Sequence, residues 1–183
     1  MYPVQLTGEH VALREFTASD LDQVYTLVSD DRVTRWLSFD SRSREQAQEM
    51  LSGILERAQA EPRLEYYLAV TPRTSDQVVG FARLGLGGVR AAKLGYAIHA
   101  DHWGRGYATD AARTLVGFGF TTLDLHRISA AIGPDNTRSI AVVKRLGFQY
   151  EGRIRDHVFT NGAWRDSLLY SVLSNEWVAR RAA

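Results

Sequence analysis

A stretch that could bind phosphate lies in the middle of the chain, at DHWGRGYATDAA, residues 101–112. Gly104 and Gly106 stand on either side of Arg105, and the residues that follow favour a helix. The N-terminus of a helix carries unpaired backbone N–H groups and a partial positive charge, and glycines let an anion approach those groups. Because the apolar run LGYAI precedes the loop, the order strand, glycine loop, helix predicts a phosphate site.

The spacing of the loop separates three phosphate-binding designs. A P-loop needs Gly-Lys and then Ser or Thr, whereas Gly106 is followed by Tyr107 and Ala108. A dinucleotide fingerprint needs a third glycine where Thr109 stands. The remaining design, Q/R-x-x-G-x-G/A, holds the pyrophosphate of coenzyme A, and the segment from Trp103 onward fits its last three positions. Taken alone, the loop is also consistent with a plain glycine turn before a helix.

The composition narrows the chemistry further. The chain has no cysteine, which excludes disulfides and a cysteinyl covalent intermediate. The five histidines show no zinc-ligand spacing, so we predict no metal site. A formal net charge of +1 gives no support to bulk nucleic-acid binding. Since there is no apolar run of membrane-spanning length and no signal-peptide pattern at the start, we expect a cytoplasmic protein.

Hydrophobic periodicity predicts a mixed α/β chain, with residues 1–183 forming a single domain. The predicted strands are 11–16, 66–70, 78–86, 93–99 and 127–132, followed by a hairpin that turns at Asn161-Gly162. Two predicted helices follow the capping boxes that begin at Thr17 and Ser43, and the second ends before Pro62. Two more helices are predicted at about 107–122 and at 136–146, the latter stopped by Gly147.

These segments together resemble the GNAT family of acetyltransferases, in the branch that includes the ribosomal-protein N-terminal acetyltransferases RimJ and RimL. The resemblance covers nearly the whole chain, in family order, through HVALREF, LGYAI, WGRGYATDAA, LHRISAAI, PDNTRSIAVVKRLGF and EGRIRDHVFTNGAWRDSLLYS. Its most specific parts are N-x-x-S ahead of K-R-L-G-F, and the later N-G-x-W-x-D.

The resemblance implies a mixed sheet flanked by helices, in which two splayed parallel strands hold the thioester arm of acetyl-CoA. Here these strands would be LGYAIH and RISAAI. The pyrophosphate would lie on the amides from Arg105 to Thr109, Asn136 would touch the cofactor arm, and a backbone N–H near Ile98 would stabilise the oxyanion. The implied cofactor-binding residues are Ile98, Trp103, Gly104, Arg105, Gly106, Tyr107, Ala108, Thr109 and Asn136.

The implied reaction is direct attack of an amine on acetyl-CoA in a ternary complex. The tyrosine that many family members use as the acid is replaced by Val143, so Ser139, the serine of N-x-x-S, becomes the candidate donor to the departing sulfur. A local first-turn hydrogen bond is its alternative role. Glu65 is the candidate base, with a solvated strand-edge carboxylate as the alternative. His99 and His102 could act as bases through a water, or be structural.

The acceptor is less well defined by the sequence. Trp36, Phe39 and Tyr96 are predicted to line its pocket, with core packing as the alternative for Tyr96. Lys93 stands where relatives often carry an acidic residue, so the acceptor can differ from theirs. It could be the α-amine of a protein, as for RimJ and RimL, or a small-molecule amine such as an antibiotic or a polyamine. A longer acyl donor and a non-catalytic acyl-CoA sensor are the other interpretations, and the resemblance also implies a possible homodimer.

Overall fold

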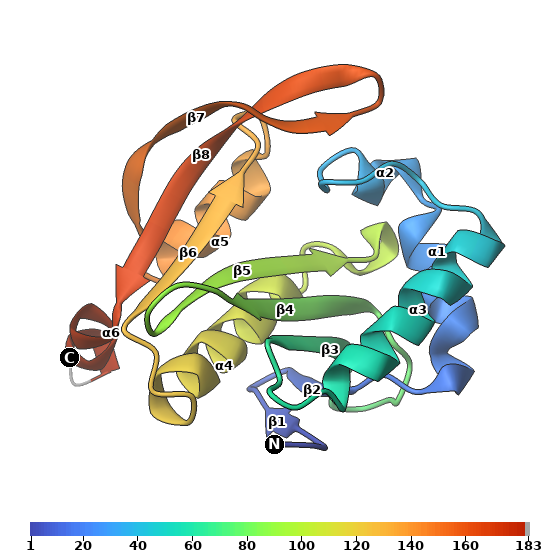
Figure 1. The fold of residues 1–183 in the computed structure, drawn as a ribbon, viewed down its shortest axis with the longest axis horizontal. Coiled ribbons are helices and arrows are strands. Elements are labelled where there is room, and N and C mark those ends of the chain that lie inside the picture. Colours follow the sequence, from blue (N-terminus) through green and yellow to red (C-terminus); the bar gives the residue numbers. More distant parts are fainter. Residues whose placement is uncertain (182–183) are drawn as a thin grey trace.

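The computed structural model describes residues 1–181 and contains one sheet of eight strands, in the order β1-β2-β3-β4-β5-β6-β8-β7 (Figure 1). The strands are β1 (Gln5–Thr7), β2 (Val11–Glu15), β3 (Glu65–Pro72), β4 (Gly80–Leu86), β5 (Ala91–Ile98), β6 (Arg127–Ile132), β7 (Gln149–Thr160) and β8 (Ala163–Leu173). The helices are α1 (Leu21–Val28), α2 (Asp31–Thr34), α3 (Arg44–Ala58), α4 (Tyr107–Thr121), α5 (Thr137–Arg145) and α6 (Ser174–Arg181), with 3-10 turns η1 (Ala18–Asp20) and η2 (Ala100–His102). The predicted mixed α/β fold is confirmed.

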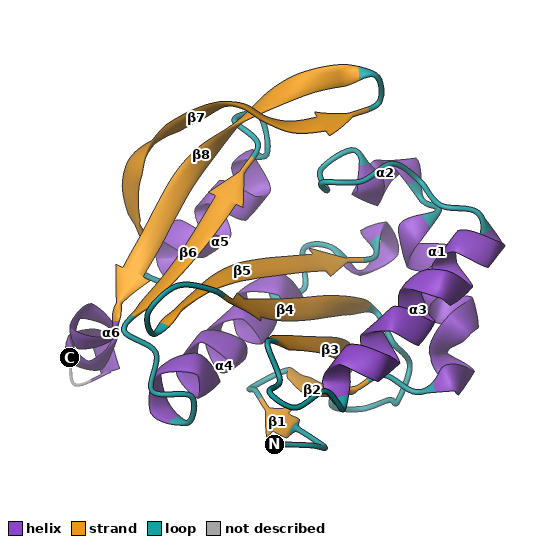
Figure 2. Ribbon diagram, in the orientation of Figure 1, coloured by secondary structure: helices purple, strands orange, loops and turns teal. Residues whose placement is uncertain are grey.

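Helices cover both faces of the sheet, α1 and α3 on one and α4 and α5 on the other (Figure 2). Strand β3 shows how the sequence fits this arrangement. Leu68 is buried in the cluster that α4 and α5 cover, whereas Tyr67 and Ala69 are buried in the cluster that α1 and α3 cover. Because both faces are covered, this strand is a continuous apolar run without polar alternation.

The sheet opens between β5 and β6, its one parallel pair among the described strands. The register consists of Ala91↔Arg127, Ala92↔Ile128 and Lys93↔Ser129. β5 continues to Ile98 along β4, and β6 continues to Ile132 along β8, so the two strands diverge beyond Lys93 (Figure 1). The predicted splayed pair is therefore confirmed, and its open side exposes the backbone edge of β5.

The predicted elements occur in the predicted order, and the structure adds three that the sequence pattern did not indicate. β1 has three residues and α2 has four, so neither is long enough to establish a hydrophobic period. The third, α6, has the sequence SNEWVARR, in which most residues are polar and Trp177 is the one large apolar residue. Ser43 forms the predicted capping box of α3, and Gly147 has the left-handed φ of a helix stop. No helix in residues 1–181 is long and apolar enough to cross a membrane.

A buried carboxylate ties the first turn of α4 to the turn between β1 and β2. Asp110 lies in the first turn of α4 and is buried. Its carboxylate accepts hydrogen bonds from the backbone N–H groups of Glu9, His10 and Val11, at 3.1, 2.8 and 3.0 Å. The glycine loop directly before α4 is held in place by the same contact.

We expect Asp110→Ala to lower the free energy of unfolding by about 2–4 kcal/mol, because it leaves three backbone donors without their acceptor. Urea unfolding followed by circular dichroism measures this change. Asp22→Ala is the matched control, since the Asp22 carboxylate is exposed and its ion pair in the described part of the chain is with Arg44 at the surface. Equal unfolding midpoints for the two variants would contradict the structural role of Asp110.

Candidate active site

The predicted glycine loop has the backbone that a phosphate site needs. Gly104 and Gly106 have φ angles of +79° and +78°, in the left-handed region that favours glycine. Gly106 is the N-cap of α4, so the unpaired N–H groups of the first helical turn follow it directly. A Cβ on Gly106 would have only His10 within reach, at 4.0 Å, which leaves open space in front of these donors. The loop therefore fits the pyrophosphate of acetyl-CoA.

The loop borders a large cleft that runs through the opening between β5 and β6 and has a volume of about 1460 Å³. Eight of the nine predicted cofactor-binding residues line it: Ile98, Trp103, Gly104, Gly106, Tyr107, Ala108, Thr109 and Asn136. The ninth, Arg105, is exposed and lies outside the lining. The cleft is larger than a typical pocket for one drug-sized ligand, as expected for a site that holds two substrates.

Backbone N–H groups of β5 point into the opening between β5 and β6. The N–H of His99 donates to the carbonyl of Val79, at 2.8 Å, so it points toward β4. Successive N–H groups of a strand point to opposite sides, and the N–H of Ile98 therefore points away from β4, where β6 has diverged. The Ile98 carbonyl on that side accepts from the indole Nε1 of Trp103, at 2.7 Å. This contact fixes the end of β5 beside the glycine loop.

The mouth of the cleft between the loop and α5 is bridged by Trp103 and Arg138. The guanidinium of Arg138, in the first turn of α5, lies 4.8 Å from the centre of the Trp103 ring. This cation–π contact brings a positive charge to the glycine loop. The sequence pattern does not indicate Arg138, because nothing local in it shows that α5 begins beside Trp103.

Ser139 lies at the cleft and is positioned by two neighbours. Asn136 is the N-cap of α5, and its side-chain oxygen accepts from the backbone N–H of Ser139, at 3.2 Å. The Oγ of Ser139 is 2.7 Å from the hydroxyl of Tyr96, which also donates to the Ser139 carbonyl, at 3.2 Å. Val143, at the family's usual acid position, is fully buried in the core.

Tyr96 extends from β5 to α5 across the opening and holds a proton next to Ser139. Burial raises the pKa of its hydroxyl to about 12, and the hydrogen bond with Ser139 opposes part of that rise. The phenol is therefore protonated at neutral pH. Its side chain lies on the α4 and α5 face of the sheet, packed against the cluster there. Tyr96 thus lines the cleft from the α4 and α5 face and its hydroxyl contacts the candidate acid, while its predicted role in the acceptor pocket stays a prediction.

Glu65 lines the same cleft, but two arginines hold its carboxylate. Oε2 accepts from Arg57, at 2.7 Å, and Oε1 accepts from Arg83. Burial alone would raise the pKa of Glu65, yet the two guanidinium groups outweigh that effect and hold it below its usual range. A carboxylate of low pKa with both oxygens engaged is a poor proton acceptor. This environment favours a role in orienting the arginines over the predicted role as base.

We expect Glu65→Gln to leave the dependence of kcat/KM on pH unchanged between about pH 6 and 9, because Glu65 stays ionised throughout that range. The measurement is a pH–rate profile of both proteins with one amine acceptor. If Glu65 were the base, the variant would lose about a hundredfold or more in kcat and the acidic limb of the profile would change.

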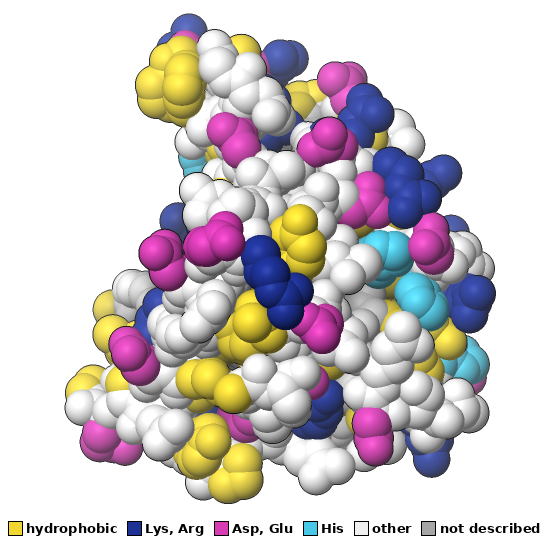
Figure 3. Space-filling view, turned by 90° about the vertical axis from the view of Figure 1, so that its right-hand side faces the viewer, with side chains coloured by type: hydrophobic (Ala, Val, Ile, Leu, Met, Phe, Trp, Pro, Cys, Tyr) yellow, Lys and Arg dark blue, Asp and Glu magenta, His cyan; other side chains and the backbone are white. Residues whose placement is uncertain are grey.

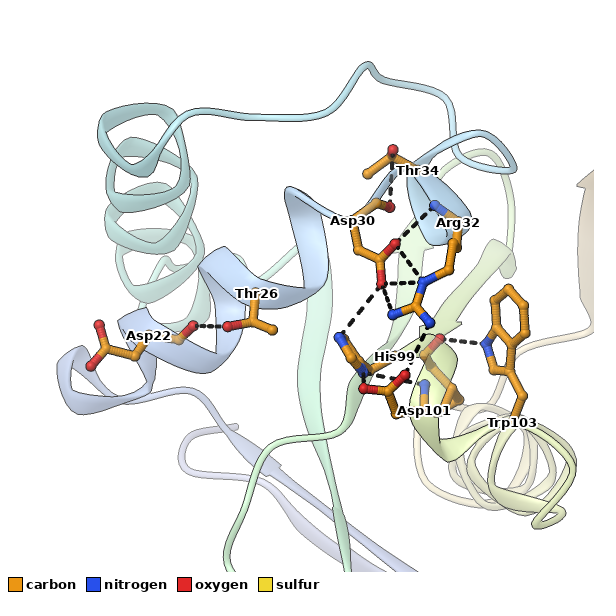
Figure 4. A network of polar contacts seen from close by, with 9 residues as sticks. Asp22, Thr26, Asp30, Arg32, Thr34, His99, Asp101 and Trp103 are labelled. Atoms are coloured by element: carbon orange, nitrogen blue, oxygen red, sulfur yellow. Dashed lines mark hydrogen bonds and ion pairs between the residues drawn. The ribbon is translucent and has the colours of Figure 1, made fainter.

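The two candidate histidines have different surroundings. His99 lies between Asp30 and Asp101, with nitrogen–oxygen distances of 3.6 and 3.7 Å. Arg32 joins both aspartates, so these side chains clamp α2 to the turn after β5 (Figure 4). His102 lines the cleft and stacks with Tyr107, and burial, then the charges of Arg105 and His99, lower its pKa. His99 is therefore part of this clamp, and His102 is neutral at pH 7, while a role of either histidine as base stays a prediction.

The predicted acceptor residues Trp36 and Phe39 line the far end of the cleft, in the segment after α2. Each lies against an arginine, Trp36 against Arg35 at 4.8 Å and Phe39 against Arg42 at 4.6 Å. The β7–β8 hairpin reaches this segment, where Arg165 donates to the carbonyls of residues 35 and 37. This end of the cleft thus lies where α2, the segment after it and the tip of the β7–β8 hairpin come near one another (Figure 1).

Comparison with known proteins agrees with this site. The sequence profile of the acetyltransferase (GNAT) domain matches residues 10–149. The N-acetyltransferase p20 of Bacillus licheniformis is 30% identical over 179 residues, which cover 94% of this chain and 97% of that protein. The ribosomal protein uS5-alanine N-acetyltransferase of Escherichia coli is 29% identical over 119 residues, 63% of this chain and 61% of that protein.

Among solved structures, RimJ of Mycobacterium smegmatis, in complex with CoA-disulfide, has the same fold with a TM-score of 0.83. It is 24% identical, and the alignment covers 99% of this chain and 98% of RimJ. The matched domain, the splayed strands and the glycine loop at α4 lead to one assignment. The chain belongs to the GNAT family and is an acetyl-CoA-dependent N-acetyltransferase.

Proposed function

We propose that this enzyme acetylates the N-terminal α-amine of a protein or peptide. The observation that carries the proposal is the open edge of β5, in a cleft lined by the glycine loop and Ser139 and also by Trp36 and Phe39 of the segment after α2. The relatives that act on ribosomal proteins support the choice of a protein α-amine. A chain end is long and narrow, and it suits a channel between α2 and the hairpin.

The two substrates approach the opening from opposite faces of the sheet. The α4 and α5 face holds the loop from Gly104 to Thr109 and the Ser139–Tyr96 pair, and it suits acetyl-CoA. The α1 and α3 face holds Glu65, Arg83 and Lys93, and it leads to the acceptor channel. In the opening, the Ile98 N–H donates a hydrogen bond to the carbonyl oxygen under attack.

The departing sulfur needs a proton, and the Ser139–Tyr96 pair can supply it. Ser139 donates from Oγ to sulfur, and the Tyr96 hydroxyl, which lies 2.7 Å from Oγ, turns from the Ser139 carbonyl to donate its proton to Oγ. The phenol is the stronger acid of the two hydroxyls, so it is the source of the proton. Asn136 keeps Ser139 in the first turn of α5 during this exchange.

The test is the position of acetylation on a peptide with an N-terminal alanine and one internal lysine. We expect fragment masses to place the acetyl group on the alanine α-amine. A control peptide with a blocked N-terminus and the same lysine should remain unmodified. Acetylation of the lysine ε-amine in both peptides would overturn the proposed acceptor while leaving the acetyltransferase activity in place.

A further inference from the structure

On the acceptor side of the cleft, the surface formed by β4 and β5 has open space with positively charged side chains around it. We call this surface, from Arg83 and Gly85 to Lys93 and Gly95, the floor of the acceptor side. Residues that stand directly opposite each other on neighbouring strands share a face, which places Arg83, Gly95, Gly85 and Lys93 together on the α1 and α3 side. A Cβ on Gly95 would meet nothing within 4 Å, and the Arg83 guanidinium lies over Gly85. Gly95 thus leaves room on this face, Gly85 accommodates the Arg83 guanidinium, and Lys93 lies on the same face.

The positive charges at this floor exceed the negative ones. Arg57 and Arg83 share the single carboxylate of Glu65. Arg42 and Lys93 also line the cleft, and neither forms an ion pair with a residue in the described part of the chain. The Nε of Arg42 is buried and has no hydrogen-bond partner there. A buried donor without a partner is costly, and an anionic oxygen is its best partner.

Tyr67 is buried on this same face of the sheet, directly opposite Arg83 on β4. Burial raises the pKa of Tyr67, and the charges of Arg83, Arg42 and Arg57 oppose part of that rise. The outer surface differs from this interior. On the one side of the molecule that Figure 3 shows, basic and acidic side chains are interspersed, and the whole chain has a net charge of only +1. The positive excess is therefore a local property of the cleft.

We propose that the acceptor carries a carboxylate within about 10 Å of its reacting amine, and that Arg42, Arg83 and Lys93 bind this carboxylate. The distance follows from the offset of three positions along β5 between Gly95, which stands opposite Arg83, and Ile98. The inference rests on the proposed function, because it concerns the acceptor side of the same site. An acidic residue just after the N-terminus of a peptide, or an amino acid, has this chemistry, whereas polyamines and aminoglycosides lack it.

The same charges explain how the amine can lose its proton without a carboxylate base. Positive groups near a bound ammonium lower its pKa and favour the neutral amine, which has the lone pair needed for attack. Water in the open cleft can then receive the proton. The negative charge of a carboxylate on the acceptor is attracted by the same positive groups, so the acceptor still binds favourably in this cationic cleft.

The experiment compares peptide amides with the sequences Ala-Asp-Gly, Ala-Asn-Gly and Ala-Arg-Gly, each with one primary amine. Thiol release from acetyl-CoA gives kcat/KM for each peptide. We expect Ala-Asp-Gly to exceed Ala-Arg-Gly by about tenfold or more at low salt, and the ratio to fall as salt is raised. Free glutamate and glutaminamide form a second arm, which distinguishes an amino-acid acceptor from a peptide.

Lys93 and Lys144 are the only lysines of the chain, which supplies a matched control. Lys93→Glu should reduce the preference for the acidic peptide about tenfold, and Arg42→Gln should reduce it in the same direction. Lys144→Glu makes the same charge change at an exposed position of α5 outside the cleft and should leave the preference unchanged. Unaltered acetyl-CoA affinity shows that each variant is folded.

Equal kcat/KM values for the acidic, neutral and basic peptides would overturn the charge inference and leave the acetyltransferase function standing. A preference that survives both Lys93→Glu and Arg42→Gln would overturn the assignment to these residues. Failure of the proposed function is a different result, since then no peptide of any charge would release thiol while acetyl-CoA still binds.

Discussion

Gly106→Val should weaken the binding of acetyl-CoA about a hundredfold, measured by calorimetry. Gly106 has a φ of +78° and caps α4, and a β-branched residue in that region is strained by roughly 1–2 kcal/mol. Relief of this strain turns the first N–H groups of the helix away from the phosphate. The added side chain also fills the open space in front of them. Both effects act on the same ligand contact, so affinity falls more than stability.

The matched control is Gly117→Val, in the same helix. A Cβ on Gly117 would meet nothing within 4 Å, and its φ lies outside the left-handed region. This variant should bind acetyl-CoA as the parent protein does. Gly106→Ala should fall between the two, because it adds the strain without the bulk. Wild-type affinity in Gly106→Val would show that the loop is only a turn before a helix.

Ser139→Ala should lower kcat about a hundredfold while changing acetyl-CoA affinity less than about threefold. The loss removes the donor to the departing sulfur, whereas the contacts with the pyrophosphate remain. Tyr96→Phe should lower kcat about tenfold, because Ser139 keeps its hydroxyl but loses the phenol behind it. Stopped-flow or steady-state thiol release measures both.

The double variant tests whether the two hydroxyls act as a unit. If Tyr96 acts through Ser139, Tyr96→Phe should have little further effect in the Ser139→Ala background. Independent losses that multiply in the double variant would contradict the relay. Tyr150→Phe is the control, since Tyr150 is an exposed tyrosine on β7 and should retain full activity.

The features that the sequence predicted well are those with local causes. The left-handed backbone at Gly104 and Gly106 could be predicted because glycine is the residue that tolerates it. The turn at Asn161 and Gly162 has positive φ at both residues, as its dipeptide indicates. The start of helix α3 could also be predicted, because the capping box of Ser43 and Gln46 lies within four consecutive residues.

What the sequence could not supply depends on contacts between distant segments. Tyr96 and Ser139 are 43 residues apart, and only the divergence of β6 from β5 brings their hydroxyls together. Nothing in the sequence around Glu65 indicates that α3 and β4 bring Arg57 and Arg83 to its carboxylate. Asp110 is one polar residue in a helix, and its backbone partners lie about 100 residues earlier.

The most direct test of the account is thiol release from acetyl-CoA with and without a peptide that has a free N-terminal amine. The chain has no cysteine, so the protein adds no thiol background. We expect release only when the amine is present, with one acetylated peptide formed for each thiol. Tight binding of acetyl-CoA with no release for any peptide or small amine would contradict the enzyme assignment of this site and favour a sensor of acyl-CoA.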